Sequence, residues 1–557
     1  MKNIKNVIFI LLSSFLISGF VSSYFEITKN LEIFNNIYRE INTYYVDPVD
    51  PGELMHSTID TMLKRLDPYT KYIPESEIED FRFQTTGDYG GIGATIRKVD
   101  KHVVIYEPYK GFPADKAGLV MGDKLLEIDE EELIDSSTED VSELLKGTPG
   151  TDVNVKVVKN NGEIKMVKIK REKIHVSSVP YAGFVGPNIG YVKLNRFTKN
   201  CTQEVEEAIQ KLEKDEKLTS IILDLRSNPG GLLNESIKLT NLFIAQNETV
   251  VTTNGKNAEW KKNYKTKLAP KYANLPIIVL VNGASASASE IVAGAIQDLD
   301  RGVVVGNKTY GKGLVQQSRK LSYNSRLKVT VAKYYTPSGR CIQDVSKTKN
   351  YNSYLDNEDS VDSLRNKFFT KKKRIVYDGG GIDPDVKIEP KNYPDVLIGL
   401  IRDNHIFKFG NTIINNLPEY NSVNDFSLTD EVYQKFTDYL NNVNFEFESY
   451  SDDIIAMLES SLDELEKEGL TTDNISESIN TLKVDIKSGK KEDINLHKEI
   501  IKNHLSANLI ARFFYHAGKI EYGLKDDPYI LEALSILNNE TEYNEILTPR
   551  TISFEKK

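Results

Sequence analysis

The segment PIIVLVNGASASASE, residues 276–290, sets the fold expected for the middle of the chain. Its first part, Pro276–Val281, is a continuous apolar run of the kind found in strands that are buried on both faces. The small residues that follow predict a tight turn, and Ala288 to Leu299 predicts a helix. Strand, turn and helix in this order indicate a layered α/β core that presents Ser287 at the end of a buried strand.

Two further strands extend this core in both directions along the chain. Ile221–Leu225 is a second buried strand, and the turn RSNPGG (226–231) leads from it into a helix that extends to Phe243. Val303–Val305 is a third, and the alternating residues 327–331 predict a β-ribbon beyond it. We assign residues 173–390 to an α/β core.

Lys312 is the candidate partner of Ser287. It follows Ser287 by 25 residues, and no histidine occurs between His175 and His405. A serine hydroxyl needs a base to remove its proton. A lysine becomes such a base when burial without a carboxylate partner lowers its pKa from about 10.4 toward neutrality. Its neighbours carry no acid, and Gln316 could orient the neutral amine, so the pattern indicates a Ser–Lys hydrolase.

Other interpretations of these residues stay open. Ser287 and Glu290 also form a capping-box pattern, and Lys312 could be an exposed loop lysine. The run GNKTYGKG, residues 306–313, nearly matches a phosphate-binding loop. However, Gly313 stands where that loop has Ser or Thr, and residues 314–318 predict a strand rather than a helix. We therefore disfavour a nucleotide site.

Residues 87–172 predict a compact β-rich module. Asn160-Asn161-Gly162 is a strong hairpin signal between two strand-like runs, and Thr138–Leu145 predicts one helix. Near the start of the module, successive amides in Gly91-Ile92-Gly93-Ala94 could form a nest for an anion. The glycines could also serve only a tight turn. A dinucleotide loop is disfavoured, because the third glycine and the βαβ context are missing.

The two ends of the chain differ in character. Lys2 and Lys5 precede an apolar stretch that continues to Phe25, which predicts a signal peptide or membrane anchor over residues 1–25. Residues 26–86 predict a helical segment interrupted at Pro48 and Pro51. Residues 391–557 predict amphipathic helices, with one stripe at 454, 458, 462 and 465 and another at 509–515, and contain no recognisable catalytic group.

Composition excludes several classes of function. The 39% hydrophobic content is that of a soluble protein, and the net charge of −10 argues against a nucleic-acid partner. The run Lys371–Arg374 is expected to be a solvated loop. Cys201 and Cys341 could pair after export or stay as buried thiols. Neither a metal nor a cofactor is expected, and a homo-oligomer is compatible with the sequence.

Several ordered motifs resemble those of the C-terminal processing (tail-specific) peptidases. The resemblance covers roughly residues 30–390, and the β-rich module resembles a PDZ domain, in which an extended peptide adds to the sheet edge. The matching motifs are LDPY (66–69), LRSNPGG (225–231), SASASE (285–290), YGKG (310–313), TPSGR (336–340) and GIDPD (381–385). The insertion at about 344–377 and the helical C-terminus depart from the family pattern.

The resemblance implies a serine endopeptidase of the cell envelope or periplasm that binds the free, apolar C-terminus of a protein substrate. It implies a multidomain α/β protein with a crotonase-like core and an inserted PDZ domain. Ser287 matches the nucleophile, Lys312 the base and Gln316 the residue that orients this base. The amide of Ala288 with that of Gly230 or Gly231 matches the oxyanion hole, and Gly91, Ile92, Gly93 and Ala94 match the carboxylate-binding loop. An inactive PDZ scaffold is the alternative, although both Ser287 and Lys312 are retained.

Overall fold

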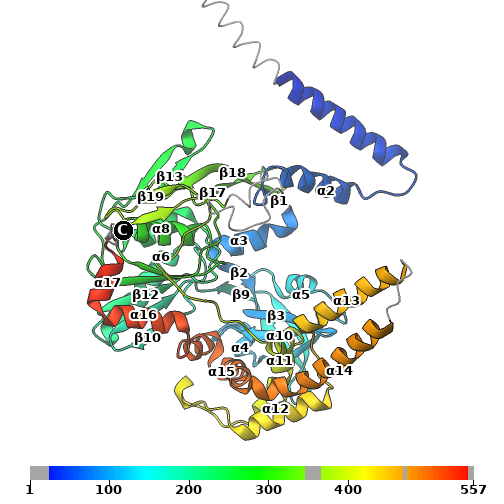
Figure 1. Cartoon of the computed structure of the whole chain (residues 1–557). Coiled ribbons are helices and arrows are strands. Elements are labelled where there is room, and N and C mark those ends of the chain that lie inside the picture. Colours follow the sequence, from blue (N-terminus) through cyan, green and yellow to red (C-terminus); the bar gives the residue numbers. More distant parts are fainter. Residues whose placement is uncertain (1–23, 345–364, 468–472, 550–557) are drawn as a thin grey trace, which may run out of the picture. The chain divides into compact units, whose positions relative to one another are not determined.

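The computed structural model describes residues 24–344, 365–467 and 473–549 (Figure 1). They form two compact units, which we describe separately. The smaller unit contains the described part of Met1–Glu75 together with Gln316–Thr330. The larger unit contains the remaining described residues.

The smaller unit begins with two helices. The first covers residues 24–44, and the second is α2 (Pro51–Lys64). Asp50 caps α2 by accepting a hydrogen bond from the Glu53 amide at 2.8 Å, so Pro51 begins this helix in the first turn, where its missing N–H costs nothing. Strand β1 (Lys71–Ile73) then pairs antiparallel with the first residues of β18 (Arg326–Tyr335).

The larger unit starts with α3 (Ile78–Thr86) and the predicted β-rich module. A two-stranded ribbon of β2 (Asp88–Gly91) and β9 (Glu172–His175) joins the ends of this module. Its main sheet has the order β3-β4-β5-β7-β8. The elements are β3 (Ala94–Val99), β4 (His102–Pro108), α4 (Pro113–Lys116), β5 (Lys124–Ile128), β6 (Glu131–Glu132), α5 (Thr138–Leu145), β7 (Asp152–Val158) and β8 (Ile164–Lys170).

Local sequence signals in this module are confirmed. The Asn160-Asn161-Gly162 turn joins β7 to β8, with Gly162 at φ +86°. Helix α5 spans the predicted residues, and Ser137 caps it by accepting a hydrogen bond from the Asp140 amide at 3.1 Å.

The peptidase-like core contains a six-stranded sheet of order β10-β11-β12-β15-β16-β21. Its neighbours are parallel from β11 onward, and only β10 runs antiparallel to β11. The strands are β10 (Tyr181–Gly186), β11 (Ile189–Lys193), β12 (Ser220–Asp224), β15 (Ile277–Val281), β16 (Val303–Gly306) and β21 (Val386–Lys387). Every residue of β15 is buried, as the continuous apolar run predicted.

Helices cover both faces of this sheet (Figure 1). One face packs against α6 (Cys201–Asp215), α7 (Leu233–Asn241) and α8 (Ala288–Asp298). The other packs against α16 (Pro528–Asn538) and α17 (Glu540–Ile546). Both of the latter helices lie in the helical C-terminal region that the sequence predicts for residues 391–557. Their apolar residues complete the core of the sheet.

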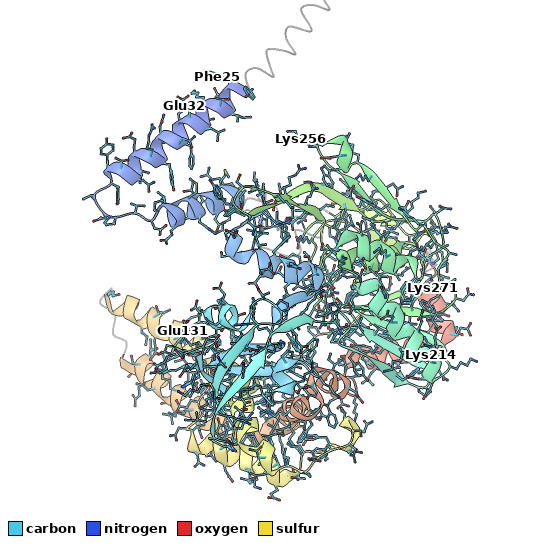
Figure 2. The ribbon with its side chains drawn as sticks, turned by 180° about the vertical axis from the view of Figure 1, so that it is seen from behind. Phe25, Glu32, Glu131, Lys214, Lys256 and Lys271 are labelled. Carbon is cyan, nitrogen blue, oxygen red and sulfur yellow. The ribbon has the colours of Figure 1, made fainter. Side chains whose placement is uncertain are left out.

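Short strands surround the core. The last residues of β18 pair with β13 (Thr249–Asn254), which pairs with β14 (Lys262–Lys265). A hairpin of β19 (Lys367–Phe369) and β20 (Ile375–Tyr377) contains the basic run. The solvated-loop prediction fails at Arg374, whose guanidinium pairs with Asp300 and Asp385 and is only 10% exposed. Elsewhere, charged side chains such as Glu131, Lys214, Lys256 and Lys271 are exposed (Figure 2).

The remaining helices form two apolar clusters, a larger one around Phe409, Phe436 and Leu505 and a smaller one that contains Ile455, Leu462 and Ile479. They are α10 (Asp395–Arg402), α11 (His405–Ile413), α12 (Asp430–Asn442), α13 (Tyr450–Lys467), α14 (Asp473–Leu496) and α15 (Lys498–Gly523). The predicted stripe on α13 is partly wrong, because Ile454 and Leu458 are 42% and 43% exposed, whereas Leu462 is buried; the side chain of Leu465 lies outside the described part of the structure. The stripe on α15 is buried from Leu509 to Ala511.

Helix α15 also contacts the β-rich module. The Arg512 guanidinium donates to the Met121 carbonyl at 3.2 Å, and Tyr515, at φ +57° where α15 kinks, donates its hydroxyl to Asp115 at 2.7 Å. The helical region therefore connects the β-rich module to helices that cover the core sheet.

Both cysteines are free; Cys201 is buried and Cys341 is half-buried, and burial raises the pKa of each thiol. Among the described helices, none is both long and apolar enough to cross a bilayer. All but the last two residues of the predicted signal segment 1–25 lie outside the described residues, as does most of the insertion at 344–377.

Candidate active site

Ser287 stands at the turn between β15 and α8, with φ 56° and ψ −111°. A residue other than glycine in such a conformation costs on the order of 1–3 kcal/mol, and surrounding contacts must hold it there. Gly230 supplies one close contact, because a Cβ at that position would lie 2.8 Å from both the Ser287 Cβ and the Ala288 nitrogen. The turn with Ser287 and the glycine turn after β12 thus lie directly against each other.

Glu290 connects Ser287 to Lys312 and is completely buried. One carboxylate oxygen, Oε2, accepts hydrogen bonds from the Ser287 amide at 2.7 Å and from the Lys312 amide at 2.9 Å. The other, Oε1, accepts from the Thr309 hydroxyl at 2.6 Å and the Gly311 amide at 2.7 Å. A single oxygen atom therefore fixes the backbones of both candidate catalytic residues.

The protonation of Glu290 is set by two opposing effects. Burial raises the pKa of Glu290, and the hydrogen bonds from Thr309 and the amides of Lys312, Gly311 and Ser287 act in the opposite direction. The sequence suggested only the capping role of this residue, at the third position of α8. Its contacts to the lysine loop connect residues about twenty positions apart, and helix-capping patterns do not report such contacts.

Further backbone hydrogen bonds hold the loop that contains Lys312. The Tyr310 amide donates to the Ser285 carbonyl at 3.0 Å, and the Gly313 amide donates to Gln343 Oε1 at 3.0 Å. The loop leads into β17 (Leu314–Lys320), a strand, whereas a phosphate-binding loop leads into a helix. The structure thus agrees with our rejection of a nucleotide site.

The two glycines of the turn RSNPGG, which are candidates for the oxyanion hole, differ in their contacts. Gly230 lies against Ser287 and Ala288, but its amide donates to Asn228 Oδ1 at 2.9 Å. Gly231 has φ +149°, and a Cβ there would lie 2.3 Å from the Phe197 carbonyl, so glycine is required. Ala288 is buried at the start of α8, where the positive end of the helix dipole favours a developing oxyanion.

The two serines beside Ser287 have structural partners. The buried Ser285 hydroxyl donates to the Leu225 carbonyl at 2.8 Å. The Ser289 hydroxyl donates to the Asn228 carbonyl at 2.9 Å. Both side chains therefore connect the turn that contains Ser287 to residues 225–228, which lead into the two glycines.

Gln316 belongs to the smaller unit, where its side-chain amide donates to the Tyr69 carbonyl at 2.5 Å. Tyr69 is the last residue of the LDPY motif, so this hydrogen bond joins residues that are 247 positions apart in the sequence. A role for Gln316 in orienting Lys312 stays a prediction.

The candidate peptide-binding loop lies at a groove of the β-rich module. Ile92 and Ala94 line this groove, together with residues of α5 such as Ser142 and Leu145 and with Phe83 of α3. Burial raises the pKa of the Tyr89 hydroxyl, and the nearby amides of Ala94 and Gly93 act in the opposite direction. These two amides of the candidate peptide-binding loop therefore lie near the Tyr89 hydroxyl.

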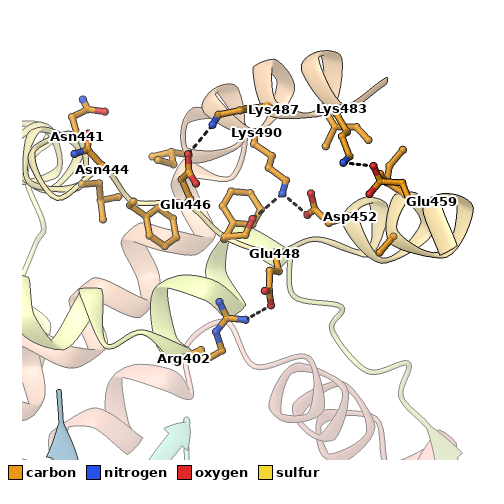
Figure 3. Close-up of a pocket in the computed structure, with 17 residues that line it drawn as sticks. Arg402, Asn441, Asn444, Glu446, Glu448, Asp452, Glu459, Lys483, Lys487 and Lys490 are labelled. Atoms are coloured by element: carbon orange, nitrogen blue, oxygen red, sulfur yellow. Dashed lines mark hydrogen bonds and ion pairs between the residues drawn. The ribbon is translucent and has the colours of Figure 1, made fainter. Parts of the chain in front are cut away.

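A second hollow, of about 1010 Å³, lies among α12, α13 and α14 (Figure 3). Ion pairs border it, including Lys490 with Asp452 and Lys487 with Glu446 at 3.0 Å. Its lining contains no serine, cysteine or histidine. Among the described residues, no group of three His, Cys, Asp or Glu side chains could hold a metal ion.

Replacing Glu290 with glutamine is expected to lower kcat about 100-fold. The amide nitrogen of glutamine would face two hydrogen-bond donors, and a displacement of about 1 Å at a catalytic group can cost this much. Peptide cleavage and thermal unfolding should both be measured. The control is Glu213→Gln on the exposed side of α6, and an unchanged kcat for Glu290→Gln would contradict the assigned role.

Comparison with known proteins agrees with this geometry. Residues 188–353 match peptidase family S41, residues 104–159 match a PDZ domain, and residues 396–537 match the C-terminal helical domain of probable PDZ-proteases. The last match corrects our placement of the helical C-terminus outside the family pattern.

Several bacterial proteins are similar over most of the chain. A probable CtpA-like serine protease of Staphylococcus aureus (strain COL) is 32% identical over 77% of this chain and 84% of its own length. A carboxy-terminal-processing protease of Bartonella bacilliformis is 34% identical over 62% of this chain and 82% of its own. A Staphylococcus haemolyticus relative is 38% identical over 58% of this chain, and the match spans 64% of its length. Among solved structures, the photosystem II D1 C-terminal processing protease is 26% identical over 66% of this chain and 95% of its own, with a TM-score of 0.33.

The fold and these relatives define a serine-type peptidase with a PDZ domain. The chain belongs to peptidase family S41, among the CtpA-like carboxy-terminal-processing proteases.

Proposed function

We propose that this chain is an endopeptidase that cleaves protein substrates with a Ser287–Lys312 dyad after binding their C-terminal tails in the PDZ groove. The shared carboxylate oxygen of Glu290, which accepts from the amides of both residues, carries the proposal. An inactive scaffold would have no need of this buried link. The alternation of parallel strands and helices also supports a crotonase-like core.

The proposed reaction follows from these positions. Lys312, as a neutral amine, takes the proton of the Ser287 hydroxyl while the serine oxygen attacks the scissile carbonyl. The Ala288 amide and a glycine amide of residues 230–231 stabilise the resulting oxyanion. Gly231 is the better second donor, because the Gly230 amide is bound to Asn228. The lysine then returns its proton to the leaving amine, and water hydrolyses the acyl-enzyme.

Tail recognition rests on the groove of the PDZ domain. A terminal carboxylate would accept hydrogen bonds from the amides of Gly93 and Ala94, which lie near the Tyr89 hydroxyl. The apolar side chains of Ile92, Ile96 and Leu145 line the same groove and favour an apolar terminal residue. The predicted signal or anchor segment supports export to the cell envelope, which fractionation of cells would test.

Amidating the C-terminus of a peptide substrate is expected to weaken its binding roughly ten- to a hundredfold. The amide loses charge-assisted hydrogen bonds that contribute about 1.5–3 kcal/mol. The measurement compares kcat/KM for free-acid and amidated peptides of one sequence. Acetylation of the N-terminus is the control, and equal rates for the free acid and the amide would refute tail recognition.

A further inference from the structure

The first turn of α16 contacts two loops of the proposed active site. This helix belongs to the layer on the face of the core sheet opposite α8, where Ile530, Ala533 and Ile536 pack against strand residues such as Ile222 and Leu280. Its N-terminus lies near the carboxyl ends of β12 and β16. The loop after β12 contains the candidate oxyanion glycines, Gly230 and Gly231, and we call it the oxyanion loop. The loop after β16 contains Lys312, and we call it the lysine loop.

The contact to the oxyanion loop is made through Arg226, the second residue after β12. The Arg226 guanidinium lies 2.7 Å from Asp527 and 2.8 Å from Asp224, and its carbon atom stands 4.7 Å from the centre of the Tyr529 ring. The side chain is 15% exposed. Because Arg226 directly precedes Ser227-Asn228-Pro229-Gly230, its position helps to set where the glycine turn begins.

The contact to the lysine loop is made through Asn307, the residue directly after β16. The Tyr529 hydroxyl donates to Asn307 Oδ1, and the Tyr529 ring would lie 3.2 Å from a Cβ on Gly306. The Asn307 amide also donates to the Val281 carbonyl at 3.1 Å. Tyr529 thus contacts the loop that leads to Lys312 as well as Arg226.

The carboxylate of Asp527 balances the charge of the cluster around Arg226. Asp224 is fully buried, and although burial alone would raise its pKa, Arg226, Lys193 and the Tyr191 hydroxyl hold that pKa well below its usual value. Asp224 thus faces two cations, with Lys193 at 3.3 Å. Asp527 supplies the second negative charge of this cluster.

We propose that Asp527 and Tyr529 are positioning residues for catalysis, which hold the oxyanion loop and the lysine loop in fixed positions relative to each other. The proposal rests on the proposed Ser–Lys peptidase function. It assigns a catalytic contribution to a helix that follows the entire peptidase core in the sequence and contains no reacting group.

The test uses Asp527→Asn in the full chain. Asp527 also caps α16 by accepting from the Tyr529 amide at 2.9 Å, and asparagine preserves this cap while removing the charge that faces Arg226. We expect kcat per active site to fall about three- to tenfold, with KM and the midpoint of thermal unfolding nearly unchanged. Active sites are counted by labelling with a fluorophosphonate probe. Asp526→Asn, an exposed neighbour, should match the wild type.

A second variant examines the other loop. Tyr529→Phe keeps the ring beside Arg226 but removes the hydroxyl that binds Asn307, and a similar fall in kcat is expected. If both variants retain the wild-type kcat per labelled site, the positioning proposal is overturned. If they lose activity only in proportion to labelled sites or to folded protein, the contacts are merely structural and the proposal is also overturned. A wild-type protein that cleaves no peptide would instead overturn the proposed function.

Discussion

Replacing Ser287 with alanine is expected to reduce peptide cleavage by at least about 10⁴-fold while the protein still folds. The substitution removes the hydroxyl that we propose as the nucleophile, and loss of a nucleophile has effects of this size in other serine peptidases. The Ser287 amide, which binds Glu290, is retained, so the turn should keep its shape. Cleavage rates and thermal unfolding measure the two parts of the expectation.

Ser285→Ala and Ser289→Ala are the matched controls. Each removes a hydroxyl from the same turn, and each leaves a carbonyl without its donor, at a cost of about 1–3 kcal/mol in stability. Both variants should nevertheless keep substantial activity. Wild-type turnover by Ser287→Ala would exclude this residue as the nucleophile.

Lys312→Arg is expected to lower kcat at least about 10³-fold. The guanidinium group keeps its proton at physiological pH and cannot act as a base, although it preserves the positive charge. The backbone amide that binds Glu290 is unaffected, so the loop should stay in place. Wild-type activity should rise with pH as a single group loses its proton, whereas Lys312→Arg should stay inactive across the range.

Lys308→Arg provides the control, because it makes the same chemical change in the same loop. It should retain most of the activity. If Lys312→Arg were active, the lysine would contribute only charge, and the dyad would have to be abandoned.

The local parts of this fold were predictable because their signals are local. A continuous apolar run specified β15, an Asn-Gly turn specified the β7–β8 hairpin, and Ser137 specified the start of α5. The spacing of Ser287 and Lys312, together with the family motifs, also identified the candidate dyad.

Contacts between distant segments were not predictable in this way. Amphipathic periodicity shows that α16 has an apolar face but does not show that this face covers the peptidase sheet. The capping pattern predicts that Glu290 binds the Ser287 amide, but it does not indicate that Glu290 also binds the Lys312 amide. On α13 the periodicity identified a stripe but not its buried side, since Ile454 and Leu458 are exposed and Ile455 is buried.

The order of segments along the chain has a consequence for synthesis of the protein. The ribosome delivers Ser287, Lys312 and all six strands of the core sheet before residues 528–546, which cover its second face. At about 5–20 residues per second, more than ten seconds separate the appearance of Lys312 from that of α16. During this interval the nascent chain contains the proposed nucleophile and base but lacks the helix that we propose to hold their loops, so we expect proteolytic activity to begin only after this last layer has folded.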